Sequence, residues 1–218
     1  MKPLALAALV LLSAAGPRAQ APPPATVILL LDITASMTLV PLPFDQRYAQ
    51  VFNAFLEGLG PAHRAAVGVV ANEAIFSAVT PDRGELSAAV RRLLRQPDAV
   101  RLGPSPLWDA IDAALSLAEA AGGRAAIVLF SDGKSGGNVR GVDEVIGRAR
   151  RLGVSVSAVV EGPGTALLAR SSSALDPADA IGRLTQATGG RHLLDRPPDP
   201  RQRNPGPLIS LIMDGLRR

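Results

Sequence analysis

Three oxygen-bearing side chains follow one apolar segment of the chain at every second position. Residues 26–31 (TVILLL) form a continuous apolar run, and Asp32, Thr34 and Ser36 come directly after it. In an extended or gently turning backbone, alternate side chains point the same way, so one carboxylate and two hydroxyls should converge. Oxygen ligands without His or Cys suit a hard cation such as Mg²⁺, which prefers an octahedral shell of oxygen atoms.

Two further oxygen groups are expected near the same place. A second apolar run, residues 125–130 (AAIVLF), is followed by Ser131 and then by Asp132. Ser105 lies in a GPSP segment that precedes an amphipathic helix. If the two runs are parallel strands, their carboxyl ends meet at one edge of the sheet, where such folds carry their binding sites. An incomplete shell of protein ligands would leave one position on the ion for a ligand from outside.

The elements that position these residues are predicted from hydrophobic periodicity. Apolar runs rich in β-forming residues indicate buried strands, and apolar residues at i, i+3, i+4 and i+7 indicate amphipathic helices. Strands are expected at 26–31, 65–70, 74–79, 125–130, 154–160 and 191–194. Helices are expected at 48–58, 82–94, 107–121, 142–152, 178–187 and 207–216.

This alternation of strands and helices predicts an α/β fold. Helices of this length between strands imply βαβ units, hence a Rossmann-like, doubly wound and mostly parallel sheet with helices on both faces. The strands at 65–70 and 74–79 are separated by Asn72-Glu73, which predicts a hairpin and therefore one antiparallel edge strand.

The first 21 residues have the pattern of a secretory signal. Lys2 precedes an apolar run at residues 4–15 that is too short to span a bilayer, and Ala19-Gln20-Ala21 offers a small-x-small cleavage site. Cleavage nearer Ala15 and an uncleaved membrane anchor are the alternatives. We therefore expect a secreted or periplasmic protein, with residues 1–21 as signal peptide and 22–218 as a single domain.

Composition excludes several other classes of protein. The chain has 218 residues, of which 47% are hydrophobic, with no Cys and two His, so disulfides, thiolate zinc sites and Cys nucleophiles are excluded. The net charge of +4 comes from scattered arginines, and one Trp, one Tyr and five Phe offer no platform for stacking bases, so no nucleic-acid partner is expected. No later stretch is long enough to predict a transmembrane segment.

Four segments resemble the motifs of von Willebrand factor type A (VWA) domains, in the order in which that family has them. LLLDITASM looks like the DxSxS segment, GPSPLWDAI like GxTxLxxA, and IVLFSDG like the strand that ends in Thr/Ser-Asp-Gly. LTQATGGRHL is similar to the stretch before the family's last strand. The resemblance implies the VWA fold, of the bacterial secreted type, with a metal-ion-dependent adhesion site.

The resemblance places that metal site on Asp32, Thr34, Ser36, Ser105 and Asp132. Thr34 stands where Ser is commonest and Ser105 where Thr is commonest, so both positions keep a hydroxyl. In the family, the hydroxyls and one carboxylate commonly bind the ion directly, and an acidic side chain of a protein partner completes the shell. The implied ion is Mg²⁺, or else Mn²⁺ or Ca²⁺, and the implied function is partner capture without catalysis.

The same residues allow an enzymatic interpretation. DITAS also resembles the phosphorylated-aspartate motif of haloacid-dehalogenase-type phosphatases. In such an Mg²⁺-dependent phosphatase, Asp32 would be the nucleophile, Ser131 a phosphate contact and Lys134 the residue that stabilises charge. The SDG segment holds only one of the acidic Mg²⁺ ligands that this chemistry needs. A metal-free scaffold domain is a third possibility.

Structural roles compete with metal binding at several positions. Asp32 could form an Asx turn, and Ser105 could cap a helix that has Pro106 at its first position. Trp108 is expected in the core, and Asp109 is expected to complement a helix dipole. The apolar segment 37–44 is expected to pack inside rather than to form the rim of a binding face.

Overall fold

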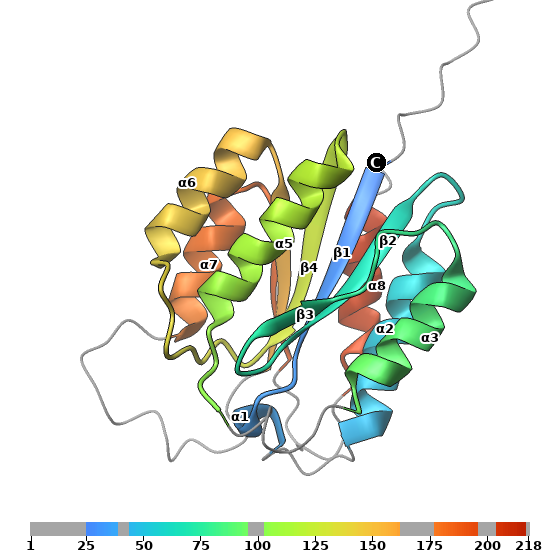
Figure 1. Cartoon of the computed structure of the whole chain (residues 1–218), viewed down its shortest axis with the longest axis horizontal. Coiled ribbons are helices and arrows are strands. Elements are labelled where there is room, and N and C mark those ends of the chain that lie inside the picture. Colours follow the sequence, from blue (N-terminus) through green and yellow to red (C-terminus); the bar gives the residue numbers. More distant parts are fainter. Residues whose placement is uncertain (1–24, 39–43, 96–102, 162–176, 196–203, 217–218) are drawn as a thin grey trace, which may run out of the picture.

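The computed structural model describes residues 25–38, 44–95, 103–161, 177–195 and 204–216 (Figure 1). The predicted signal peptide and residues 39–43 lie outside the described residues. Within the described ranges, no helix combines the length and the hydropathy that crossing a bilayer would require.

One six-stranded sheet forms the centre of the molecule, with the strand order β3-β2-β1-β4-β5-β6. The strands are β1 (Ala25–Asp32), β2 (Arg64–Val70), β3 (Ala74–Phe76), β4 (Arg124–Ser131), β5 (Ser155–Glu161) and β6 (His192–Asp195). All neighbouring pairs are parallel except β2 and β3, which form an antiparallel hairpin at one edge. The predicted α/β sheet with one antiparallel edge strand is therefore confirmed.

Helices cover both faces of the sheet (Figure 1). α2 (Phe44–Gly58), α3 (Arg83–Leu93) and α8 (Gly206–Leu216) contribute to one core cluster, and α5 (Leu107–Ala121), α6 (Val142–Leu152) and α7 (Pro177–Ala187) to the other. Val27, Leu29 and Leu31 of β1 belong to the first cluster, whereas Ile28 and Leu30 belong to the second. β1 is thus buried on both faces, as its continuous apolar run predicts.

Two local features differ from the sequence-based prediction. A short helix, α1 (Ala35–Thr38), follows β1 and was not predicted. β3 ends at Phe76 rather than at residue 79, because the pairing changes register there: Gly68 pairs with Phe76, but Ala65 pairs with Thr80. One extra residue in the second strand is a β-bulge, and the Ser77 hydroxyl accepts the Val67 N–H at 3.0 Å within it.

The glycine pair in the TGG segment lets the chain pass close to β5 on its way to β6. Gly189 has a positive φ of 73°, which favours glycine. Gly190 lies directly against the backbone of Val156, so a Cβ at this position would overlap the Val156 carbonyl group. This close approach brings β6 into register beside β5.

We predict that Gly190→Ala lowers the free energy of unfolding by about 3 kcal/mol, because the added methyl group can be accommodated only by moving backbone. Gly136→Ala is the matched control, because Gly136 has open space around it. Urea unfolding of both variants measures the difference. Equal stability of the two variants would show that the approach of Gly190 to β5 is not required.

Candidate metal centre

Four of the five predicted metal ligands, Asp32, Thr34, Ser36 and Asp132, lie at or directly after the carboxyl ends of β1 and β4, where the strand order reverses. β1 ends at Asp32 and β4 at Ser131, and the two strands are direct neighbours in the sheet. The Ser131 hydroxyl donates a hydrogen bond of 2.6 Å to Oδ2 of Asp32. In Figure 1 this edge of the sheet lies at the bottom, next to α1.

Asp32 has a side chain that is fully buried and held on both oxygens. Its Oδ1 accepts the Thr34 hydroxyl at 2.6 Å and the Thr34 N–H at 3.0 Å. The Thr34 hydroxyl lies 3.4 Å from that of Ser36. The structure thus brings Asp32, Thr34 and Ser36 together. It also contains the Asx turn that was expected at Asp32 as an alternative, but such a turn does not explain the additional hydrogen bond from Ser131.

Asp132 contributes a second negative charge to this region. The pKa of Asp32 is raised to about 6: burial raises it most, the nearby charge of Asp132 adds to the rise, and the hydrogen bonds from Ser131 and Thr34 partly offset it. The Asp132 side chain is 11% exposed, and its Oδ2 lies 3.2 Å from Nζ of Lys134. The two carboxylates are therefore close enough to repel, and the second has a partner of opposite charge.

Ser105 is tied to the loop that follows Asp132. Its hydroxyl donates to the Lys134 carbonyl at 3.3 Å, and its own carbonyl accepts the Gly136 N–H at 2.8 Å. The alternative in which Ser105 caps α5 is wrong: Pro106 is the N-cap, and no side chain of the cap residue bonds the helix. Ser105 is therefore bonded to the loop that follows Asp132, and none of the hydrogen bonds described for Ser105 reaches Asp32.

Two residues that the sequence analysis missed or assigned differently hold this loop against α5. The Asn138 side chain accepts the Trp108 N–H at 2.8 Å and so satisfies the exposed start of the helix. Asp109, expected to complement the helix dipole, accepts the N–H groups of Val139 and Arg140 at 2.8 and 2.7 Å. Trp108 is 8% exposed, which confirms its predicted place in the core.

Two buried residues of α2 hold the candidate centre from the other side. The Tyr48 hydroxyl donates to the carbonyl of Asp32, and the Arg47 guanidinium donates to the carbonyl of Met37. Arg47 also forms an ion pair of 2.9 Å with Glu161 at the end of β5. Met37 is fully buried, which confirms the packing interpretation for that residue of the segment 37–44. Nothing in the sequence predicted that Arg47 would be buried, because arginines in amphipathic helices are usually exposed.

The donor atoms fit a hard cation. Two carboxylates and the hydroxyls of Thr34, Ser36 and Ser131 supply oxygen only, and Ser105 lies on the adjoining loop. Lys134 pairs with Asp132, but the buried Asp32 carboxylate has no cationic partner among the described residues, and a divalent ion would supply that charge. In the described part of the chain, no group of three or more His, Cys, Asp or Glu could hold a metal, so such a centre depends on hydroxyl ligands.

Comparison with known proteins identifies the fold. No protein-family model and no curated protein matches the sequence. BatB from Bacteroides thetaiotaomicron is similar in structure, with 19% identity, a TM-score of 0.62, and 88% of this chain and 97% of that chain covered. A von Willebrand factor type A structure from Catenulispora acidiphila has 13% identity, a TM-score of 0.65, and 89% and 42% covered.

A third similar structure leads to the same assignment. The SpRpn10 VWA domain has 19% identity and a TM-score of 0.55, with 87% of this chain and 94% of that chain covered. At these identities the likeness concerns the fold alone. The chain has the fold of a von Willebrand factor type A domain.

Proposed function

We propose that this chain is a non-enzymatic binding module that captures a protein partner through a divalent cation at the carboxyl ends of β1 and β4. The observation that carries the proposal is the buried Asp32 carboxylate, which is surrounded by hydroxyl groups and lies near Asp132. An ordinary turn needs one such bond, whereas this carboxylate accepts three.

The residues divide the work of holding the ion. Asp32, Thr34, Ser36, Ser105 and Asp132 are the proposed ligands, either directly or through water, and Mg²⁺ is the proposed ion, with Mn²⁺ or Ca²⁺ as alternatives. When bound, the ion supplies positive charge and an open ligand position. Ser131 orients the Asp32 carboxylate through its hydrogen bond. Arg47 and Tyr48 fix the backbone on either side of the DITAS segment.

An acidic side chain of a protein is the proposed partner group. With one carboxylate bound directly and the other through water, the ion keeps net positive charge toward the open position, and a carboxylate is the protein group that best compensates it. The predicted signal peptide supports a place outside the cytoplasm, secreted or periplasmic, where such a partner would be met. Nothing in the arrangement favours the phosphatase alternative, because Lys134, which would have to stabilise charge at Asp32, pairs with Asp132 instead.

We predict that Mg²⁺ or Mn²⁺ at ten times its dissociation constant stabilises the protein by about 1.4 kcal/mol and raises the melting temperature by roughly 3–6 °C. A chelator should reverse the rise, and Asp132→Ala should prevent it. Asp143→Asn is the matched control, because this aspartate lies on α6 with 77% of its side chain exposed. A melting curve that does not respond to either ion would reject the metal site.

Replacing the buried carboxylate separates stability from metal binding. We expect Asp32→Asn in chelator at pH 7 to melt at least as high as the unaltered protein, because the variant buries no charge. The same variant should show no metal-induced rise. Differential scanning calorimetry with and without Mg²⁺ measures both effects. A large loss of stability in chelator would instead make Asp32 a structural residue, and a metal response that survives would exclude it as a ligand.

Partner capture can be tested directly with immobilised protein and extracts of the cell envelope or culture medium. We predict that a bound protein elutes with chelator, is absent from the Asp132→Ala column, and is lost when carboxylates in the extract are first amidated. The proposal would be contradicted if the same protein were captured in the presence of chelator and by the Asp132→Ala column. Hydrolysis of p-nitrophenyl phosphate that disappears in Asp32→Asn would favour the phosphatase instead.

A further inference from the structure

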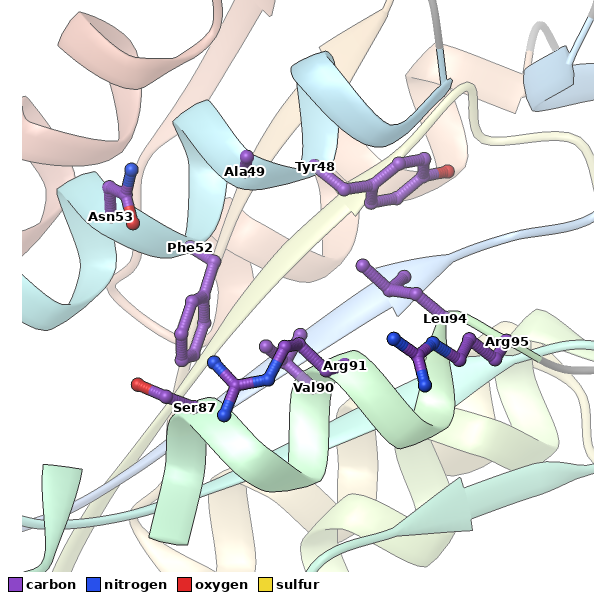
Figure 2. A pocket seen from close by; sticks show the side chains of 9 residues that line it. All are labelled: Tyr48, Ala49, Phe52, Asn53, Ser87, Val90, Arg91, Leu94 and Arg95. Atoms are coloured by element: carbon purple, nitrogen blue, oxygen red, sulfur yellow. The ribbon is translucent and has the colours of Figure 1, made fainter. Parts of the chain in front are cut away.

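A groove opens between α2 and α3 on the face of the sheet that these helices cover (Figure 2). Its volume is about 410 Å³, which lies within the range of small-molecule sites in proteins. It is lined by Tyr48, Ala49, Phe52, Asn53, Ser87, Val90, Arg91, Leu94 and Arg95. Only Tyr48 also contacts the candidate metal centre, so the groove is a separate site.

The inner wall of the groove is apolar. Phe52 points from α2 toward α3 in Figure 2, and Phe52 and Val90 are only 6% and 5% exposed. Leu94 is half-buried beside them. Asn53 and Ser87 supply the few polar groups besides the arginines. A wall of this kind fits an alkyl or aryl body rather than a free inorganic ion.

Two arginines give the groove a charge of one sign. Arg91 lies in the last turn of α3 and Arg95 two residues beyond its end, both are exposed, and none of the described residues that line the groove is acidic. Neither guanidinium has an ion pair or hydrogen bond with a described residue, whereas Arg148 on α6 pairs with Asp112 and Glu119. Two positive charges beside one groove repel each other, and a bound anion would relieve that repulsion.

We propose that this groove binds a small amphipathic carboxylate, with its apolar chain against Phe52, Val90 and Leu94 and its carboxylate between Arg91 and Arg95. Guanidinium groups favour carboxylates because their paired N–H donors match the two oxygens. The volume of about 410 Å³ favours a small molecule over a folded partner, which would need a far larger contact area.

Calorimetric titration of the full chain with octanoate tests the proposal. We expect saturable binding at one site, with acetate and octan-1-ol at least tenfold weaker, because each lacks either the tail or the charge. The titration is done in chelator, so that its outcome does not depend on a metal site. Absence of saturable octanoate binding, or equal affinity for octan-1-ol, would overturn the proposal.

Variants at the groove locate the site. The pair Arg91→Gln and Arg95→Gln together should weaken octanoate binding at least tenfold, since bonds to charged groups are lost. Arg92→Gln is the matched control, because Arg92 is an exposed neighbour on α3 that does not line the groove. Ala49→Trp, at an exposed lining position, should fill the groove and abolish binding. The assignment would be refuted if the double variant and Ala49→Trp bound octanoate as tightly as the unaltered protein. It would also be refuted if an acidic apolar peptide bound the groove and octanoate did not.

Discussion

The structure of the candidate centre depends on one carboxylate, that of Asp32, which is buried away from solvent at the end of β1. Asp32 is fully buried, and an ionised group in such a place is costly unless hydrogen bonds and positive charge compensate it. The hydroxyls of Thr34 and Ser131 supply the first kind of compensation. Asp132 works against it, because a second negative charge nearby raises the pKa of Asp32 further. Such a cluster is stable only if its surroundings hold it rigidly or if a cation completes it.

The fold supplies that rigidity from several separate parts of the chain. The parallel pairing of β1 with β4 sets Ser131 beside Asp32, and α2 reaches across to the backbone of the DITAS segment through Tyr48 and Arg47. On the opposite face, Asp109 at the start of α5 binds the loop after Asp132 by two backbone amides. The bonds made by Ser131 and Asp109 join residues far apart in the sequence. The site therefore forms only when β1 and β4 have paired and α5 has packed beside them.

Periodicity in the sequence predicts the elements well because it is a local property of each segment. The apolar run before Asp32 and the helical spacing from Leu107 both correspond to elements that the structure contains. The spacing of Asp32, Thr34 and Ser36 predicts their convergence for the same reason. The bulge near Ser77, the bond from Ser105 to the Lys134 carbonyl and the burial of Arg47 were not predicted, because each depends on a neighbour that only the tertiary structure provides.

Arginine shows most clearly where sequence reasoning stops. Arg47 and Arg91 both occupy amphipathic helices, yet the first is buried against Glu161 and the second lines an apolar groove whose other described residues include no acid. Tyr48 connects the two environments, because it lines the groove while its hydroxyl donates to the Asp32 carbonyl. If a ligand in the groove alters the affinity of the metal centre through Tyr48, then the metal must alter the affinity of the groove by the same factor. Tyr48 is the one described residue of the groove lining that also contacts the candidate metal centre, so a coupling of the two proposed sites through a shared side chain would pass through it.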